Sequence, residues 1–313
     1  MRRSVCGTMM GRPGHELGRA LLFTAVVTLF VAAACTVAAC GRGVAAQKGA
    51  DAPAPQPLRI ALLHIAPASG DLVGNIALIR AAVAEAADRG ADWCITPELA
   101  LSGYFFRREI GLHWIDPLSS DRVAAFSHLA RSNAVTLFVG MPTRDGSPAR
   151  LHNSVVVIDK SGRVLGAYHK RIVIPSAVEG WASPGQRVGV FAVDGVDVGV
   201  LVCADAWPRR LAHRTASAGA QILVSPACWA PGQMGPSGVW ERDSRLTGLP
   251  LLVCNTTGRV KEDDNRRSAS VVDDEGRRLF TFRSPTSEVF LVDWDRQAGT
   301  FTYAGRFSPQ VSP

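Results

Sequence analysis

Short apolar runs alternate with amphipathic stretches through most of this 313-residue chain, and this alternation restricts the fold more than any other feature. Residues 58–64 (LRIALLH) predict a buried strand, and residues 75–89 repeat apolar positions at helical spacing before Gly90 ends the pattern. Two hairpins are expected, over 151–158 with 163–169 and over 267–273 with 277–282. Further strands are expected at 93–96, 135–141, 198–203, 221–225, 249–255 and 289–294, with further helices at 121–132, 211–218 and 240–248. These elements predict an α/β fold with a mixed sheet whose faces are covered by helices.

Cys203 ends the apolar run VGVLVC over residues 198–203, and the sequence ADAWP that follows breaks the pattern. The sheet would hold the backbone of this cysteine while its side chain points into a cleft, which is a suitable position for a nucleophile. A free cysteine is also among the most frequently buried residue types, so packing is the alternative explanation for this stretch taken alone.

Glu98 lies just after the strand expected at 93–96, within the sequence PELALSGY. A carboxylate between proline and leucine residues at such a position is poorly solvated, which is the environment that a general base requires. The alternative is a glutamate at a helix N-terminus that stabilises the helix dipole.

Lys170 follows the second strand of the first predicted hairpin, in the sequence YHKRIVIP. A lysine at the end of a strand is normally a solvated surface residue. In this segment the apolar residues after Arg171 indicate that the chain returns to the interior. His169, one position earlier on the strand, would point to the opposite side.

Glu98, Lys170 and Cys203 each end a predicted strand, so one edge of the sheet could bring them together. This set fits acyl transfer from an amide or a nitrile. A thiolate attacks the carbon, a carboxylate accepts and returns the proton, and a cation with a backbone N–H stabilises the oxyanion. None of the seven histidines lies in a motif that would support a hydroxyl nucleophile.

These motifs resemble those of the nitrilase, or carbon-nitrogen hydrolase, superfamily, and the resemblance extends over about 58–296. PELALSGY, YHKRIVIP and VLVCADAWP stand in the family's order and spacing, with SPACW as a fourth matching segment. The resemblance implies an α/β fold of the four-layer α-β-β-α sandwich type. It also implies that Cys203 is the nucleophile, Glu98 the general base and Lys170 the oxyanion stabiliser.

The resemblance assigns further residues by their positions in the same motifs. Glu179, in the sequence PSAVEGW, matches an additional glutamate that orients the site in many members. The Ala204 N–H would be a second oxyanion donor, and Trp229 would form a wall of the pocket. Tyr104 and Trp207 are expected to contact the substrate.

The expected activity is hydrolysis of a non-peptide carbon-nitrogen bond, in an amide or carbamoyl compound, through a cysteine acyl-enzyme that releases ammonia or an amine. Arg209 stands after Pro208 where the commonest amidase pattern has glutamate, and this leaves the substrate class open. Nitrile hydrolysis and acyl transfer to an amine are alternatives of the same class. A binding protein that has kept the fold without turnover is an alternative of another class. The expected partner is a small-molecule substrate, and no metal or cofactor is expected.

Residues 1–39 predict a signal peptide of the lipoprotein type, because arginines precede an unbroken apolar stretch over 20–39. The sequence VAAC that ends at Cys40 resembles the bacterial lipobox, which implies cleavage before Cys40 and lipidation of its thiol. An uncleaved membrane anchor is an alternative, since the stretch is long enough to cross a bilayer, and ordinary signal cleavage is another. All three predict an extracytoplasmic protein, and the first two attach it to the membrane, facing the periplasm or at the cell surface.

Residues 40–57 are rich in proline and alanine and lack periodicity, so they predict a tether. The carbon-nitrogen hydrolase domain is expected over 58–296, followed by a C-terminal tail over 297–313. A homo-oligomer is expected from the family resemblance and from the apolar content of a chain with no second domain.

The formal net charge of +7 is partly local, because residues 1–39 carry four arginines against one glutamate. The chain has no lysine- and arginine-rich run with interleaved aromatic residues, so no nucleic-acid partner is expected. Its seven cysteines show neither a disulfide framework nor a CxxC metal pattern. Cys228 and Cys254 both end apolar runs and could be bridged, but buried thiols are favoured.

Overall fold

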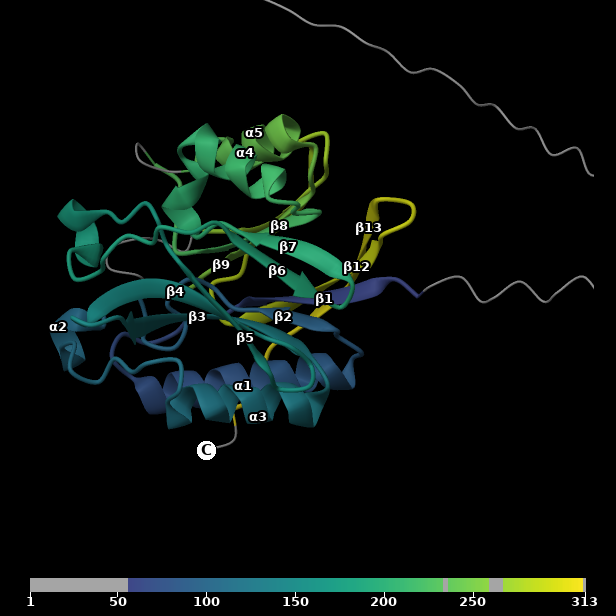
Figure 1. The fold of residues 1–313 in the computed structure, drawn as a ribbon. Helices are drawn as coiled ribbons and strands as arrows, with labels where there is room; N and C mark the ends of the chain where they lie inside the picture. Colours follow the sequence, from purple (N-terminus) through teal and green to yellow (C-terminus); the bar gives the residue numbers. More distant parts are fainter. Residues whose placement is uncertain (1–55, 233–235, 259–266, 312–313) are drawn as a thin grey trace, which may run out of the picture. The chain divides into compact units, whose positions relative to one another are not determined.

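The structure is a computed structural model, and it describes residues 56–232, 236–258 and 267–311. These residues form two β-sheets packed face to face, with helices on both outer faces (Figure 1). This arrangement is the α-β-β-α sandwich that the family resemblance implies. Residues 1–39, Cys40 and all but the last two residues of the expected tether lie outside the described residues. Within the described ranges, none of the helices combines the length and the apolar character needed to cross a membrane.

The first sheet has seven strands in the order β13-β12-β1-β2-β3-β4-β5. Its centre is parallel, because β1 pairs with β2 and β2 with β3 in the parallel sense, and the remaining pairs are antiparallel. The strands are β1 (Leu58–His64), β2 (Trp93–Ile95), β3 (Thr136–Asp145), β4 (Arg150–Ile158), β5 (Val164–His169), β12 (Glu288–Asp295) and β13 (Thr300–Phe307).

The second sheet has six strands in the order β11-β10-β9-β8-β7-β6. In this sheet β7, β8 and β9 are parallel and the outer pairs are antiparallel. The strands are β6 (Gly189–Val193), β7 (Val196–Val200), β8 (Ile222–Ala227), β9 (Leu251–Asn255), β10 (Ala269–Val272) and β11 (Arg278–Phe282).

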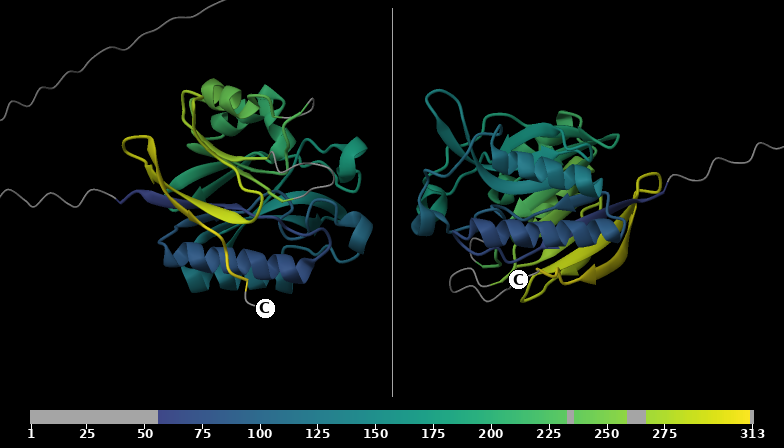
Figure 2. Two further views of the ribbon diagram at one scale, coloured as in Figure 1. Left: turned by 180° about the vertical axis from the view of Figure 1, so that it is seen from behind. Right: turned by 90° about the horizontal axis from the view of Figure 1, so that it is seen from below.

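Two helices cover the outer face of each sheet (Figure 1). Helices α1 (Leu72–Asp88) and α3 (Asp121–Asn133) lie on the first sheet, side by side in the view from below (Figure 2). Helices α4 (Arg209–Ser217) and α5 (Val239–Thr247) lie on the second sheet. A single turn, α2 (Arg107–Ile110), stands apart from both pairs at one end of the first sheet.

Strand β1 shows why the central strands are continuous apolar runs in the sequence. Ile60 and Leu62 belong to the core between the two sheets, whereas Ala61 and Leu63 belong to the core beneath α1 and α3. Because successive side chains point to opposite faces and both faces are covered, every position of the strand from Ile60 onward is buried. The candidate site is built from residues that follow the ends of such strands.

The structure differs from the sequence expectations in the number of sheets and at the C-terminus, and it adds the unpredicted elements β6 and α2. The expected single mixed sheet is two sheets, which is the form that the family resemblance implies. Residues 297–313 are not a simple tail, because Thr300–Phe307 form β13, which pairs with β12 along one edge of the first sheet. Phe301 and Phe307 are buried and none of the residues between them is, so this edge strand lacks the continuous apolar run that marks a central strand.

Candidate active site

Glu98 lies in the turn after β2, and β3 holds this turn in place. The Gly140 N–H on β3 donates to Oγ1 of Thr96 at 2.8 Å. A Cβ at Gly140 would collide with the carbonyl oxygen of Pro97, so only glycine allows this approach. Leu99 has a φ of 52°, an uncommon value for a residue other than glycine. The turn brings the Glu98 side chain into the interior, where the residue is 1% exposed.

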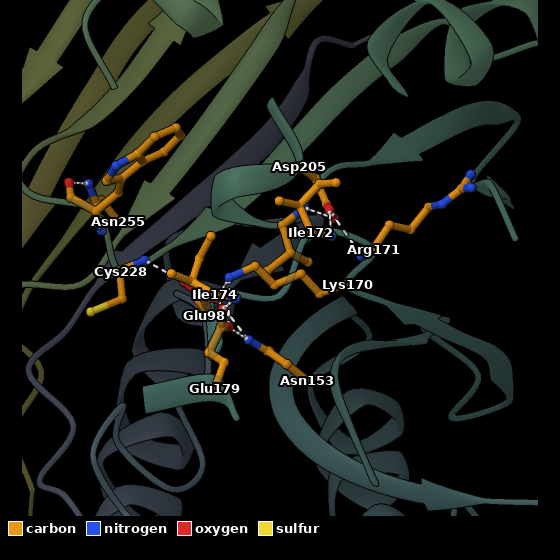
Figure 3. Close-up of polar contacts among 12 residues, drawn as sticks. Glu98, Asn153, Lys170, Arg171, Ile172, Ile174, Glu179, Asp205, Cys228 and Asn255 are labelled. Carbon is orange, nitrogen blue, oxygen red and sulfur yellow. Dashed lines mark hydrogen bonds and ion pairs between the residues drawn. The ribbon is translucent and has the colours of Figure 1, made fainter. Parts of the chain in front are cut away.

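Lys170 directly follows β5, and its ammonium group lies between two carboxylates (Figure 3). Its Nζ donates to Oε1 of Glu98 and to Oε1 of Glu179, each at 2.7 Å. The side chain of Asn153, from β4, donates to the same two oxygens at 2.8 and 2.6 Å. The three charged side chains are fully buried. Four segments of the chain thus meet in one charged cluster.

Backbone amides hold the other carboxylate oxygens of this cluster. Oε2 of Glu98 accepts a hydrogen bond from the Cys228 N–H, and Oε2 of Glu179 accepts one from the Ile174 N–H, each at 2.9 Å. Each carboxylate is therefore fixed at both oxygens. A group held in this way needs little reorganisation when charge develops beside it.

Cys203 begins a turn of 3-10 helix, Cys203–Ala206, in the loop after β7. The strand ends at Val200, three residues earlier than the sequence predicts, and the cysteine has a φ of 50°. Such a backbone costs about 1–3 kcal/mol and persists only where the surroundings impose it. This strained turn places a buried thiol, 5% exposed, at the end of the second sheet.

The charges of the cluster act on the thiol of Cys203. Burial raises its pKa well above the ordinary range, Glu98 raises it further, and Lys170 opposes both. Burial alone would lower the pKa of Lys170, but Glu98, Cys203 and Glu179 raise it well above its ordinary range. Burial likewise raises the pKa of Glu179, with Lys170 opposing. The resting site therefore holds a neutral thiol beside a charged ammonium group.

Asp205 is a site residue that the sequence pattern does not single out. Its Oδ1 accepts hydrogen bonds from the N–H groups of the two residues after Lys170, namely Arg171 at 3.0 Å and Ile172 at 2.7 Å (Figure 3). The carboxylate is fully buried. Because Asp205 belongs to the turn that Cys203 begins, these bonds tie the segment of the cation to the segment of the thiol.

The sequence does carry a usable signal for Asn153 and Asp205. Asn153 stands within the apolar strand LHNSVVVI, and Asp205 stands between alanines at the end of another apolar run. A polar residue within a buried run is more informative than an apolar one, because it must find a hydrogen-bond partner there. The partners themselves come from other segments, and the sequence pattern does not identify them.

Two predicted pocket residues, Trp207 and Trp229, lie against each other. Their ring centroids are 5.5 Å apart in an edge-to-face arrangement. The side chain of Asn255 forms two hydrogen bonds with the backbone of Trp229. It accepts from the N–H and donates to the carbonyl oxygen, each at 2.9 Å. Trp207 ends the turn of Cys203, so this aromatic pair borders the thiol's own loop.

The other two predicted pocket residues are also near the cluster. Ala204 is buried in the turn next to Cys203. Burial raises the pKa of the Tyr104 hydroxyl well above its ordinary value, and the charges of Glu98 and Glu179 raise it further. The tyrosine therefore lies within electrostatic reach of the carboxylates. It also lines a cavity of about 200 Å³ together with Val178, the neighbour of Glu179.

Within the described part of the chain, the cysteines form no disulfide with one another. These are Cys94, Cys203, Cys228 and Cys254. The possible bridge between Cys228 and Cys254 is therefore not formed in this structure, in agreement with the favoured expectation of buried thiols.

The described residues combine a sandwich of two sheets with a buried lysine that lies between two glutamates. A cysteine on a strained turn lies beside this lysine. Together these features restrict the class of protein to which the chain can belong. Residues 59–300 match the family model named "Carbon-nitrogen hydrolase". The chain belongs to this family.

Several curated proteins share sequence similarity with the chain. A "Hydrolase in pqqF 5'region" of Pseudomonas protegens is 31% identical over 54% of this chain and 59% of its own length. The glutamine-dependent NAD(+) synthetase of Thermotoga maritima is 31% identical over 76% of this chain and 42% of its own length. An (R)-stereoselective amidase of a Pseudomonas species is 26% identical over 76% of this chain and 86% of its own length. The chain thus spans about half the length of the first two relatives.

Solved structures show the same fold. An amidase of Nesterenkonia AN1 from the nitrilase superfamily aligns with a TM-score of 0.67 at 24% identity, over 77% of this chain and 92% of its own. Nit3 of Saccharomyces cerevisiae, also of the nitrilase superfamily, aligns with a TM-score of 0.70 at 17% identity, over 78% of this chain and 92% of its own. At these identities the likeness concerns the fold alone.

Proposed function

We propose that the protein hydrolyses a non-peptide carbon-nitrogen bond, in an amide or carbamoyl compound, through an acyl-enzyme on Cys203. The observation that carries the proposal is the placement of the Lys170 ammonium between Glu98 and Glu179, within electrostatic reach of the Cys203 thiol. A nucleophile, a proton acceptor and a cation for the oxyanion are the groups that acyl transfer needs.

The first half of the reaction begins with the neutral thiol. As Sγ of Cys203 attacks the carbonyl carbon, Glu98 accepts the thiol proton and negative charge moves to the carbonyl oxygen. The ammonium of Lys170 has three N–H donors, and two of them bind Glu98 and Glu179. The third would stabilise the oxyanion together with the N–H of Ala204.

Collapse of the tetrahedral intermediate completes the first half, acylation, and hydrolysis of the thioester is the second half. The tetrahedral intermediate collapses with cleavage of the carbon-nitrogen bond, Glu98 returns the proton to the leaving nitrogen, and the acyl group remains on Cys203 as a thioester. Water then loses a proton to Glu98 and attacks the thioester, which frees the carboxylic acid and restores the thiol. Glu179 holds Lys170 in position during both halves.

The names of the relatives support an amide or ureido substrate. They include a glutamine-dependent synthetase, a citrullinase of Francisella tularensis and an (R)-stereoselective amidase. Nitrile hydrolysis and acyl transfer to an amine use the same intermediate and remain alternatives within the class. A catalytically silent binding protein is the alternative of another class.

The test is release of ammonia from a panel of purified compounds: short aliphatic amides, glutamine, citrulline, N-carbamoyl compounds and the matching nitriles. The full chain is compared with Cys203→Ala, which lacks the nucleophile, and with Cys94→Ala, which loses a buried thiol that packs in the core beneath α1 and α3. We expect turnover of at least one amide or carbamoyl compound by the parent and by Cys94→Ala, and none by Cys203→Ala. Equal turnover by Cys203→Ala would remove the proposal.

We propose further that the enzyme is extracytoplasmic and attached to the membrane through a lipid on Cys40. The support is the VAAC sequence that ends at Cys40, followed by the proline-rich residues 41–57. In a bacterial host, the parent should fractionate with membranes and gain the mass of a diacylglyceryl group after loss of residues 1–39, whereas Cys40→Ala should show neither change. Unaltered mass and fractionation in Cys40→Ala would contradict lipidation.

We also propose a homo-oligomer, supported by the family and by the chain's apolar content. The helices beside the turn of Cys203, α4 and α5, are the expected contact. Light scattering at micromolar concentration should give at least twice the mass of one chain, and a fully active monomer would contradict the proposal.

A further inference from the structure

A second cluster of chemically capable side chains lies on strands β3, β4 and β5, on the opposite side from the candidate active site. Asn153 lies on β4 and Lys170 directly follows β5, and both side chains point to the charged cluster. Their neighbours His152 and His169 therefore point the other way. Asp145, at the end of β3, meets both histidines there.

The three side chains converge on a small volume. Oδ1 of Asp145 lies 2.8 Å from Nε2 of His152, and its Oδ2 lies 3.2 Å from Nε2 of His169. The two imidazole rings are stacked with centroids 4.1 Å apart. One ligand atom from each residue lies within 4.8 Å of the other two. Atoms that share a tetrahedral zinc ion are about 3.3 Å apart, so little movement would be needed to bind one.

The hydrogen bonds of His152 require a cation between its ring and Asp145. Its Nδ1 lies 2.8 Å from the carbonyl oxygen of Ser183, which can only accept, so Nδ1 carries a hydrogen. In a neutral ring Nε2 then presents a lone pair, and this lone pair faces the carboxylate oxygen of Asp145. Two lone pairs at 2.8 Å repel each other unless a metal ion or a second proton lies between them. His152 is 5% exposed, so its ring has little access to water, whereas the carboxylate of Asp145 is half exposed.

The surroundings match those of a metal site. Metal-binding histidines usually bond through the second ring nitrogen to a carbonyl or another polar group, as His152 does to Ser183. His169 does the same through Nδ1, which lies 2.7 Å from Oγ of Ser154. The cluster also lines a cavity of about 720 Å³, which gives an ion access and leaves room for a further ligand.

We propose that Asp145, His152 and His169 bind one divalent transition-metal ion of the zinc class. Two imidazoles and a carboxylate suit such ions rather than calcium or magnesium, which prefer oxygen ligands. The three residues are not clustered in the sequence and include no cysteine, so a CxxC spacing does not reveal the site. The ion would hold β3, β4 and β5 together on the side opposite Asn153 and Lys170. This inference does not depend on the proposed catalytic function.

The experiment is calorimetric titration of the untagged, chelator-treated full chain with Zn²⁺. All proteins carry Cys203→Ala, because a reactive thiol would itself bind the ion. Asp145→Asn and His169→Gln are compared with Asp197→Asn and His213→Gln, which change an exposed aspartate and an exposed histidine away from the cluster. A Co²⁺ spectrum identifies the ligand type, because thiolate ligands add near-ultraviolet bands that nitrogen and oxygen ligands lack.

We expect one Zn²⁺ per chain and an increase in melting temperature on binding. Asp145→Asn should weaken binding at least about tenfold, the lower end of the loss seen when even an outer partner is removed. The two control variants should bind as the parent does. The exposed Asp145 side chain makes that variant informative even if His169→Gln does not fold. No stoichiometric binding by the parent, or equal binding by Asp145→Asn, would overturn the proposal.

Discussion

The hydroxyl of Tyr168 donates a 2.8 Å hydrogen bond to Oδ2 of Asp205, and this bond joins the two sheets beside the site. Tyr168 lies on β5 of the first sheet, two residues before Lys170. Asp205 lies in the turn after β7 of the second sheet, two residues after Cys203. Together with the two bonds that Asp205 accepts from Arg171 and Ile172, this buried bond fixes the segment of the cation relative to the segment of the thiol.

Removing this bond should slow the reaction more than it weakens substrate binding. Tyr168→Phe leaves the ring in the core and deletes the donor, at a cost of about 1 kcal/mol in unfolding free energy. A shift of Lys170 relative to Cys203 should lower kcat about tenfold or more with little change in KM, because positioning acts on the reacting atoms. The measurements are urea unfolding and steady-state kinetics on a substrate found in the panel.

The control for Tyr168→Phe is Tyr303→Phe, since Tyr303 is 43% exposed on the edge strand β13. Tyr303→Phe should change neither the free energy of unfolding nor kcat. Asp205→Asn should lose more stability and more kcat than Tyr168→Phe, because an amide nitrogen cannot accept the backbone hydrogen bonds that Asp205 accepts. If Tyr168→Phe loses stability but keeps its kcat, the bond has no positioning role.

Glu98→Gln should separate the two halves of the proposed reaction. It preserves the shape of the side chain but removes the proton acceptor, so a thioester that does form should persist because water is not activated. Mass spectrometry of the quenched protein should show an acyl adduct on Glu98→Gln and none on Cys203→Ala. Cys203→Ser should be almost inactive, because a serine hydroxyl is a much weaker acid than a thiol and Glu98 is too weak a base to remove its proton. An adduct that survives in Cys203→Ala would place the nucleophile elsewhere.

Much of the architecture could be predicted from the sequence, because the buried strands are distinctive. Double coverage makes β1 apolar from Ile60 to Leu63 and β4 apolar from Val155 to Ile158, so these runs are visible in the sequence. The edge strand β13 is hidden by its mixed composition, whereas the edge strand β6 (GVFAV) is apolar but only five residues long and is not among the predicted strands. The division into two sheets depends on which strands pair, which local patterns do not encode.

The candidate site could be predicted where a residue follows a buried strand. Glu98 and Lys170 do lie just after strand ends, and the structure brings them together with Glu179. Asn153 and Asp205 were not predicted because their roles are contacts with distant segments.

His64 should make the stability of the protein depend on pH. It is buried at the end of β1, and its Nδ1 lies 2.7 Å from the Asn255 carbonyl oxygen, which can accept its hydrogen. Burial lowers the pKa of His64 to about 4, with the Asn255 bond opposing and Arg267 adding to the decrease. Because this value is below that of an unfolded histidine, its contribution to stability is complete above about pH 6.5 and is lost as pH falls through about 4.

The test of His64 is the difference in unfolding free energy between parent and His64→Asn as a function of pH. Asparagine can donate to the same carbonyl but does not titrate. Between pH 7 and pH 4 the parent should lose on the order of 3 kcal/mol more than the variant, from the shift in the pKa of His64. His213→Asn, which changes an exposed histidine, should retain the parent's slope. Parallel pH profiles of the parent and His64→Asn would mean that the buried ring does not resist protonation.

The charge of Lys170 should be needed for folding as well as for catalysis. Lys170→Met leaves the carboxylates of Glu98 and Glu179 buried and uncompensated, which costs about 3–5 kcal/mol of stability. Adding Glu98→Gln removes one of the two negative charges, so the double variant should recover a large part of that loss while staying inactive. The coupling free energy from a double-mutant cycle is the measured quantity.

Two further observations make this test specific to the buried charge. Lys160→Met breaks an exposed ion pair with Asp194, in which the lysine side chain is 63% exposed, and should cost about 1 kcal/mol or less of stability.

In Lys170→Met the pKa of Glu179, already raised by burial, loses the opposing effect of Lys170 and rises further. A carboxyl group with a raised folded pKa stabilises the fold at low pH and loses that contribution as pH rises through its folded pKa. Lys170→Met should therefore be closest to the parent in stability under acidic conditions and fall behind it as pH increases. Strictly additive costs in the double variant, with no such pH dependence, would mean that the three side chains are held by packing rather than by their charges.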